Sequence, residues 1–230
     1  MRPYYEHAGV TIYHGDAREI LPTLSPASVI TDPVWPNASK LLAGSENPLR
    51  LWRQTMRVLP RSVGCLVVHL GVLSDPRFLF PVPKRLKFFR TCWLPFLPVS
   101  FAGRAVVGND VAYAFGVPPG KGIIAGQSRP EGGKSLFPKG HGRNRAQKDY
   151  ADALVRAPHP TPRKLAHLQW LAVRFGEALL CDPFAGTGTT LLAAKQMGIE
   201  VVGIEIEERH CEFAAKRLGQ EVFQFGEVEA

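Results

Sequence analysis

The sequence has no paired-cysteine motif, no long apolar run and no leader-like beginning. Its four cysteines are scattered, and no His/Cys cluster has the spacing of a zinc site, so we expect buried, reduced thiols and no metal ligands. The longest run without a charged residue, 91–103, has 13 residues and contains two prolines, which is too short for a bilayer span. Residues 1–16 show no basic segment followed by an apolar one, as a secretion signal would. These absences predict a cytoplasmic protein with no membrane partner.

Acidic residues are scarce in the first three quarters of the chain. Residues 1–176 contain 24 Lys/Arg and 10 Asp/Glu, whereas residues 177–230 contain 4 and 10, and together they give the net charge of +8. An uneven but merely solvated surface could produce this distribution. We favour a basic part that faces nucleic acid, joined to an acidic part with another role. With 45% hydrophobic and 21% charged residues, the chain is otherwise typical of one globular domain.

Hydrophobic periodicity predicts alternating strands and helices. Short apolar runs rich in β-branched residues are typical of strands that are covered on both faces, as in a parallel sheet. Apolar residues at helical spacing, closed by proline or glycine, predict helices. We expect strands at 10–14, 28–31, 63–70, 110–115, 178–181 and 200–206, helices at 47–59, 162–175, 187–197 and 208–218, and a helix then a strand within 76–104. The final strand–helix–strand–helix order predicts an α/β fold with a Rossmann-like, doubly wound, mostly parallel sheet.

A glycine-rich turn lies between a predicted strand and a predicted helix. Residues 181–190 read CDPFAGTGTT, in which Gly186 and Gly188 allow the backbone to approach a ligand and the helix N-terminus favours a phosphate or carboxylate. Glu205 ends the next predicted strand, where its carboxylate can accept hydrogen bonds from ribose hydroxyls. This context favours a cofactor that contains a nucleoside. A dinucleotide fingerprint needs a third glycine where the chain has Leu191, which disfavours a dinucleotide oxidoreductase.

The same turn closely resembles the S-adenosylmethionine loop of amino-group DNA methyltransferases, D-P-F-x-G-[ST]-G-[ST]-T. Other family motifs have counterparts in the same order. These are the adenine-contacting GD element at 15–16, the catalytic [DNS]-P-P-[YFW] motif at 31–35 (TDPVW), a late strand at 109–115 (NDVAYAF) and an H-P-T element at 159–161. The catalytic motif precedes a variable basic segment and the cofactor loop. This is the circularly permuted order of the β-type enzymes, which are encoded by prokaryotes and phages.

The resemblance implies three parts and a reaction. The parts are a catalytic half at 1–116, a target-recognition insertion at 117–157 and an S-adenosylmethionine-binding half at 158–230. The reaction is methyl transfer from S-adenosylmethionine to the N6 amino group of an adenine flipped out of double-stranded DNA. The resemblance also leaves three alternatives open: an N4-cytosine DNA methyltransferase, an RNA adenine methyltransferase with a similar D-P-P-W motif, and a catalytically weak DNA-binding relic.

The TDPVW segment supplies the residues that this chemistry needs. The adenine amino group is a poor nucleophile because its lone pair is delocalised into the ring. The carboxylate of Asp32 and the carbonyl of Pro33 can accept the amino hydrogens and draw the lone pair back onto nitrogen, while Trp35 can stack on the base. Asp32 could instead serve only as a turn or helix-capping residue. Aspartate at this position favours adenine over cytosine by resemblance, and Val34 in place of the second proline motivates the relic alternative.

The resemblance also implies the cofactor-binding residues. Thr161 and the threonines of the turn are expected to meet the methionine carboxylate, and Phe184 either packs on the cofactor or belongs to the core. Arg163 stands where the family has lysine. The complete cofactor set is Asp16, Ala17, Thr161, Asp182, Phe184, Ala185, Gly186, Thr187, Gly188, Thr189, Thr190 and Glu205.

Basic residues of the insertion are the expected DNA contacts. They can bind phosphates, and an arginine can read guanine edges. A mobile, solvated loop is the other interpretation of this segment. The expected contacts are Lys121, Arg129, Lys134, Lys139, Arg143, Arg145 and Lys148. A second basic stretch, 50–104, is predicted to line the same cleft, and the shortness of the insertion is compatible with a short target or with a homodimer that shares recognition.

Overall fold

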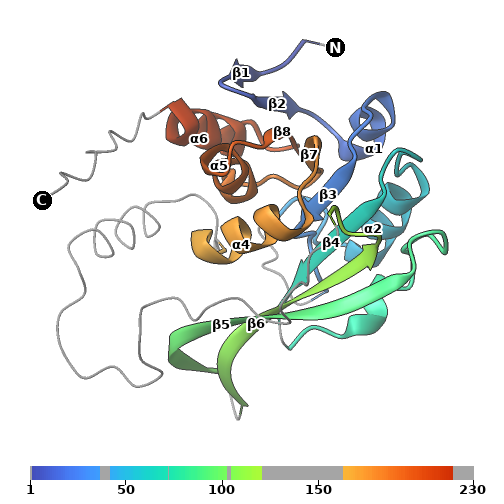
Figure 1. The fold of residues 1–230 in the computed structure, drawn as a ribbon, viewed down its shortest axis with the longest axis vertical. Helices are drawn as coiled ribbons and strands as arrows, with labels where there is room; N and C mark the ends of the chain where they lie inside the picture. Colours follow the sequence, from blue (N-terminus) through green and yellow to red (C-terminus); the bar gives the residue numbers. More distant parts are fainter. Residues whose placement is uncertain (1, 37–41, 72, 103–104, 121–162, 220–230) are drawn as a thin grey trace, which may run out of the picture.

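The computed structural model describes residues 2–36, 42–71, 73–102, 105–120 and 163–219. Within these residues the chain forms an eight-stranded sheet with helices on both faces (Figure 1). The strands are β1 (Tyr5–His7), β2 (Val10–His14), β3 (Ser28–Thr31), β4 (Cys65–Leu70), β5 (Phe88–Ala102), β6 (Ala105–Gly116), β7 (Leu179–Asp182) and β8 (Glu200–Glu205). The helices are α1 (Ala17–Ile20), α2 (Pro48–Arg57), α4 (Leu165–Phe175), α5 (Thr189–Gln196) and α6 (Glu208–Gly219), with 3-10 turns η1 (Leu21–Thr23) and η2 (Pro76–Leu79).

The sheet is mostly parallel, with an antiparallel addition at each side. The strand order is β1-β2-β8-β7-β3-β4-β6-β5. Strands β2, β8, β7, β3 and β4 run parallel to their neighbours, whereas β1 pairs antiparallel with β2, and β6 pairs antiparallel with both β4 and β5. The predicted α/β class with a doubly wound, mostly parallel sheet is therefore confirmed.

Burial on both faces explains why the central strands are apolar throughout. In β4 the side chains of Cys65 and Val67 belong to one buried cluster, together with α4, α5 and α6, while Leu66 and Val68 belong to the other, together with α1, α2 and η2. Figure 1 shows these two groups of helices on opposite sides of the sheet. A strand between two helical layers has no solvent-facing side, so its hydrophobic run is continuous rather than alternating. All four cysteines are buried in this core, as expected.

The order of the strands places the site. From β7 the chain passes through α5 to β8 on one side, and from β3 it passes through α2 to β4 on the other. Ligands of open α/β sheets bind outside the carboxyl ends of the strands at such a divergence. Asp182 ends β7, Asp32 directly follows β3 and Glu205 ends β8. The topology therefore gathers residues from both ends of the sequence at one edge of the sheet.

Several element boundaries differ from the predicted ones for local reasons. The helix expected from 187 begins at Thr189, because Gly188 has a φ of 78° in the left-handed region, which a helix does not accommodate. The helix expected from 162 begins at Leu165, and Lys164 before it is extended. Strand β6 starts at Ala105 rather than 110, because it pairs along the length of β5. Among the described residues, no helix has both the length and the apolar character needed to cross a membrane.

Candidate active site

A cavity of about 410 Å³ opens at the carboxyl ends of the parallel strands. Its walls come from the β2–α1 turn, the segment after β3, residues 42–54, the β7–α5 turn and the start of the segment after β8. The structure thus brings residues of the predicted catalytic motif and of the predicted cofactor site into one cavity. The predicted site residues that line it are Asp16, Ala17, Asp32, Pro33, Trp35, Phe184, Gly186 and Glu205.

The catalytic candidate Asp32 is held by a side chain from a distant segment. Arg163 donates from Nε to Asp32 Oδ2 at 2.6 Å and from Nη2 to Oδ1 at 3.0 Å. Trp35 Nε1 donates to the same Oδ1 at 2.9 Å, and the Arg163 guanidinium lies 4.2 Å from the centroid of the Trp35 ring. Each carboxylate oxygen can accept two hydrogen bonds. Oδ1 therefore has both positions filled, whereas Oδ2 accepts one donor from the described residues.

Opposing effects set the charge of Asp32. Burial raises its pKa, and the nearby Asp110 adds to this, while the charge and hydrogen bonds of Arg163 and the Trp35 indole N–H lower it; the net pKa is above the usual value. Arg163 also lies 3.3 Å from Asp110, between Nη1 and Oδ2. The guanidinium therefore supports an ionised acceptor at a place where burial alone would favour the protonated acid.

Asp182 connects the catalytic segment to the glycine-rich turn. Its Oδ1 accepts hydrogen bonds from Thr31 Oγ1 at 2.8 Å and from the Phe184 backbone N–H at 3.1 Å. Burial raises the pKa of Asp182 to about 6, although hydrogen bonds from Thr190, Thr31 and Phe184 oppose the shift. Since Thr31 immediately precedes Asp32, this contact fixes the catalytic segment relative to the turn.

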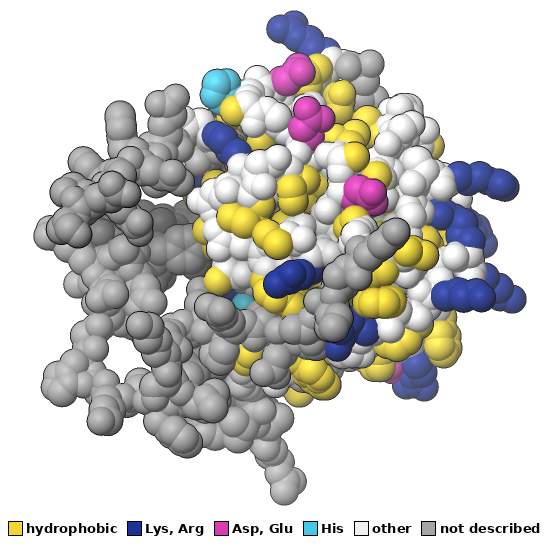
Figure 2. All heavy atoms as spheres, in the orientation of Figure 1, with side chains coloured by type: hydrophobic (Ala, Val, Ile, Leu, Met, Phe, Trp, Pro, Cys, Tyr) yellow, Lys and Arg dark blue, Asp and Glu magenta, His cyan; other side chains and the backbone are white. Residues whose placement is uncertain are grey.

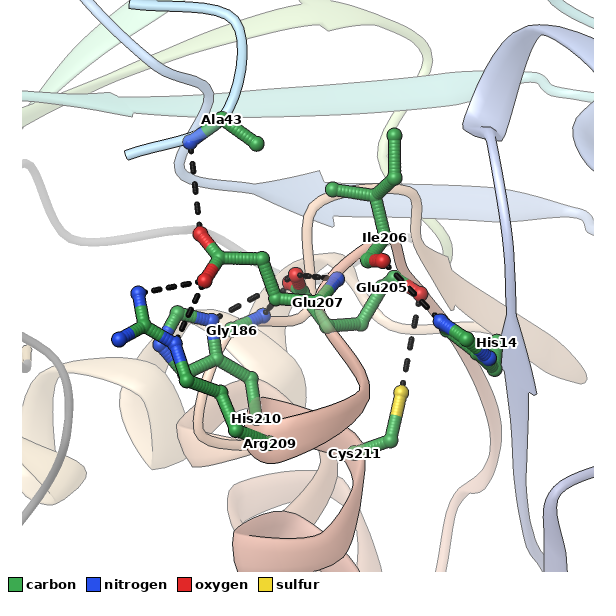
Figure 3. Close-up of polar contacts among 9 residues, drawn as sticks. All are labelled: His14, Ala43, Gly186, Glu205, Ile206, Glu207, Arg209, His210 and Cys211. Carbon is green, nitrogen blue, oxygen red and sulfur yellow. Dashed lines mark hydrogen bonds and ion pairs between the residues drawn. The ribbon is translucent and has the colours of Figure 1, made fainter. Parts of the chain in front are cut away.

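Glu205, the predicted ribose acceptor, is held by donors close to it in the fold (Figure 3). Its Oε2 accepts the Gly186 backbone N–H at 2.8 Å, and its Oε1 accepts the Glu207 backbone N–H at 2.8 Å and lies 3.5 Å from His210 Nδ1. Burial alone would raise the pKa of Glu205, but these donors bring it below the usual value. Glu205 is therefore an ionised, fixed acceptor, and it occupies the Gly186 amide that the glycine-rich turn was expected to offer to a ligand.

Asp16, which was predicted to contact the adenine of the cofactor, caps the N-terminus of α1. Its Oδ1 accepts the Arg18 backbone N–H at 2.8 Å, and its carboxylate also binds the Arg18 guanidinium, which reaches Gln54 of α2 at 2.6 Å. Hydrogen bonds from Arg18 lower the pKa of Asp16 despite partial burial. Asp16 thus stays ionised at the rim of the cavity, and its contact with adenine stays a prediction.

The rest of the glycine-rich turn lies behind the cavity wall. Arg217 of α6 donates to the Thr187 carbonyl at 3.3 Å and to Thr189 Oγ1 at 3.1 Å. A Cβ on Gly188 would lie 2.9 Å from the Ala214 Cβ, so glycine is required there for the packing of α6. Six predicted residues do not line the cavity, namely Asp182, Ala185, Thr187, Gly188, Thr189 and Thr190. Their contacts with a cofactor, and those of Thr161 outside the described residues, stay predictions.

Other cavity residues were not found by sequence reasoning. Residues 42–54 contribute a wall, and Glu207 Oε1 accepts the Ala43 backbone N–H at 3.3 Å (Figure 3). Gly71, just after β4, leaves room for Trp35, because a Cβ there would lie 2.8 Å from Trp35 Cζ3. For Glu207, the run of acidic residues after β8 was a sequence feature that could have indicated a place in the site. Residues 42–54 reach the cavity through tertiary packing, which no local sequence pattern predicts.

Comparison with known proteins agrees with this geometry. A family model described as DNA methylase, of the N6/N4 methyltransferase type, matches residues 30–217. The chain belongs to this DNA methylase family. The end of strand β3, the segment with Asp32 and Trp35, the glycine-rich turn and Glu205 fall inside the match.

Solved structures of DNA methylases share the fold. The complex of M1.HpyAVI with SAM is 22% identical, with a TM-score of 0.59 over 92% of this chain and 100% of that one. The cytosine-N4-specific PvuII DNA methyltransferase is 16% identical, with a TM-score of 0.65 over 96% and 90%. TTHA0409 of Thermus thermophilus, complexed with S-adenosyl-L-methionine, is 22% identical, with a TM-score of 0.52 over 93% and 96%.

A curated relative matches a shorter stretch. YubD of Escherichia coli (strain K12), which is named as a methylase, is 40% identical over 62 residues. The match covers 26% of this chain and 27% of YubD, so about a quarter of that relative's length is represented. The similarity is consistent with the family assignment and is too short to transfer an activity.

Proposed function

We propose that this protein transfers a methyl group from S-adenosylmethionine to the N6 amino group of an adenine flipped out of double-stranded DNA. The observation that supports the proposal most directly is the shared cavity. A carboxylate suited to the reacting amino group, Asp32, and a carboxylate suited to ribose, Glu205, line the same space of about 410 Å³ in a member of a DNA methylase family. This volume falls within the range of small-molecule sites, about 300–1,000 Å³.

The cofactor end of the cavity fits an adenosine-containing ligand. Glu205 offers an ionised carboxylate whose orientation is fixed by the Gly186 and Glu207 amides, and such a group suits the two hydroxyls of a ribose. Phe184 and Ile204 add apolar surface to the lining. When bound, S-adenosylmethionine supplies an electrophilic methyl group on a cationic sulfur. The acidic residues of this half of the cavity, which include Glu207, suit that charge.

The catalytic end of the cavity suits an amino group. Asp32 Oδ2 has one acceptor position beyond the Arg163 contact among the described residues, and the Pro33 carbonyl is the second acceptor expected from the motif. Hydrogen bonds from the amino group to these oxygens would localise its lone pair on nitrogen and hold it in place. Arg163 covers part of the Trp35 ring, so a stacked base would take the opposite face or displace the guanidinium.

The DNA-binding part of the proposal rests on charge. Figure 2 shows Lys and Arg side chains gathered on the side of the molecule where α1 and α2 lie. The exposed residues Arg50, Arg53 and Arg57 belong to α2, and Arg50 also lines the cavity. Such a surface suits the phosphates that flank a flipped base. The predicted recognition insertion, 117–157, has only residues 117–120 inside the described part of the chain, so its seven basic contacts and a shared homodimer interface stay predictions.

The choice of adenine is tested by product analysis. Unmethylated duplex DNA is incubated with the protein and S-adenosylmethionine that carries a labelled methyl group, and the digested nucleosides are separated by mass. We expect labelled N6-methyladenine. Label only in N4-methylcytosine would contradict the adenine assignment, and label in a competing RNA but not in DNA would contradict the substrate class. Absence of label in every substrate, with DNA binding retained, would support the relic alternative.

A further inference from the structure

A second polar cluster lies under α4, next to the catalytic segment. It consists of His69 on β4, Asp110 on β6 and His167 on α4. One ligand atom from each residue, an imidazole nitrogen or a carboxylate oxygen, lies within 4.8 Å of the other two. Both histidines are 0% exposed, while the Asp110 side chain is 18% exposed. Three elements far apart in the sequence thus direct three potential metal ligands toward one point.

His69 has polar atoms that the described residues leave unused. Neither of its ring nitrogens has a hydrogen-bond partner among those residues, although the side chain is fully buried. Buried polar atoms nearly always have a partner, because an unpaired one has lost its hydrogen bonds to water without replacement. A ligand within the cluster would give at least one of the two nitrogens its partner.

One ring nitrogen of His167 contacts a backbone carbonyl, as is usual in metal-bound histidines. Its Nε2 lies 3.0 Å from the Pro95 backbone carbonyl, which can only accept a hydrogen bond. In a neutral imidazole the hydrogen therefore sits on Nε2, and Nδ1 carries the lone pair. Metal-bound histidines almost always donate the second ring N–H to a carbonyl or carboxylate in this manner. The Pro95 contact thus selects the tautomer in which His167 can bind a cation through Nδ1.

Asp110 supplies the negative charge that the two imidazoles lack. Its Oδ2 lies 3.3 Å from Arg163 Nη1, and a carboxylate can bind a cation through one oxygen while the other faces a guanidinium. Two imidazoles and a carboxylate form the donor set of zinc and of the neighbouring divalent transition metals, rather than of magnesium or calcium. Asp110 is also the one member of the three that is partly exposed to solvent.

We propose that His69, Asp110 and His167 bind one divalent transition-metal ion of the zinc class. The ion would tie α4 to β4 and β6 at the edge of the active site. Because Asp110 also contacts Arg163, which holds Asp32, the ion would act on the catalytic carboxylate only through that arginine. This site was not predicted from the sequence, because a metal site is recognised there by ligands that are close together. The three residues lie tens of positions apart and meet only in the fold.

The test measures metal binding by the untagged full-length protein. The protein is dialysed against a chelator and then against buffer with zinc chloride, and bound zinc is measured by elemental mass spectrometry. We expect one zinc ion per chain and a higher melting temperature at saturating zinc, since an ion that binds only the folded state stabilises it. Titration with cobalt(II) should give visible ligand-field bands without a thiolate charge-transfer band, because all four cysteines lie outside the cluster. No zinc above the dialysis background would overturn the proposal.

Variants separate this site from other binding. Asp110→Asn keeps the size of a partly exposed side chain, and His69→Leu removes a buried ligand; each should weaken zinc binding by at least about tenfold. His7→Ala is the matched control, because His7 is exposed and distant in sequence from the cluster, and it should bind zinc like the wild type. Circular dichroism of each apo variant checks folding. Wild-type zinc affinity in folded Asp110→Asn, or a thiolate band in the cobalt spectrum, would contradict the assigned ligands.

Discussion

Asp32 and Glu205 face the same cavity, yet their surroundings shift their acidities in opposite directions. Burial dominates at Asp32 and raises its pKa, whereas at Glu205 hydrogen bonds overcome burial and lower it. Glu205 is held by the buried side chain of His210 and by the backbone amides of Glu207 and Gly186, all close to it in the fold. Asp32 is held by the side chain of Arg163, 131 residues away in the sequence. The carboxylate proposed to bind is thus held by groups within its own strand–turn–helix unit, whereas the one proposed to react depends on an arginine from a distant segment.

The largest effect should come from removing Asp32, the proposed catalytic carboxylate. In Asp32→Ala we expect methyl transfer to fall by about 10²- to 10³-fold or more, because the amino group loses its charged acceptor. Binding of S-adenosylmethionine, measured by calorimetry, should stay within a few-fold of the wild type. Asp75→Ala is the matched control, because Asp75 is an exposed carboxylate that also accepts from an arginine. An Asp32→Ala protein with wild-type activity would sink the proposed mechanism.

Glu205→Gln should have the opposite effect to Asp32→Ala: it should weaken cofactor binding more than it slows methyl transfer. The variant keeps the shape of the side chain but loses its charge and one acceptor, so we expect the Kd for S-adenosylmethionine to rise by about 10- to 100-fold, the equivalent of one or two charged hydrogen bonds. At saturating cofactor the rate of methyl transfer should recover most of its wild-type value. A lower rate at saturation with an unchanged Kd would show that Glu205 acts on the reacting end of the cavity, and the contrast with Asp32 would fail.

Arg163→Ala tests whether this distant cation keeps Asp32 ionised. Activity that needs the carboxylate falls as the pH drops through its pKa. Burial raises the pKa of Asp32, and Arg163 opposes that shift. Removal of Arg163 should therefore move the acidic limb of the kcat/KM profile to higher pH. Arg163→Lys should shift it less, since the charge stays.

The control for this profile is Arg77→Ala, in which an exposed arginine loses its pairing with Asp75. Its acidic limb should coincide with that of the wild type. An unchanged limb in Arg163→Ala would mean that the guanidinium only packs against Trp35, while a uniform loss of activity at every pH would assign Arg163 to substrate positioning rather than to the charge of Asp32.

The same contrast shows which features local sequence can predict. The central strands, α5 and the Glu205 position were predicted because each depends on a short apolar pattern or on one strand–turn–helix unit. The family motifs located Asp32 and Trp35. The partnership of Asp32 with Arg163 and Asp110, and the packing of Gly188 on Ala214, were not predicted, because these contacts join elements that meet only after the sheet has formed. The sequence motif identified Arg163 only as a substitute for a family lysine, and it did not predict the contact with Asp32.

Asp182 offers the smallest and most quantitative test, because it combines local and distant donors. Its Oδ1 receives both the Phe184 amide and the Thr31 hydroxyl, and an asparagine Oδ1 can receive the same two bonds. Burial raises the pKa of Asp182 to about 6 from the usual 3.8, so its protonation stabilises the folded state below about pH 4, and this contribution is lost as the pH rises through 6.

Between pH 5 and pH 8 the wild type should therefore lose about 1 kcal/mol of folding free energy at this residue, which Asp182→Asn should not lose. Urea unfolding at both pH values measures the difference. Asp75→Asn is the control, because the pKa of Asp75 is lowered by Arg77 and the group stays ionised throughout this range. The difference in free energy of unfolding between Asp182→Asn and the wild type should change from pH 5 to pH 8. If it does not, Asp182 is already ionised at pH 5. Its hydrogen bonds would then outweigh its burial, and Asp182 would resemble Glu205 rather than Asp32.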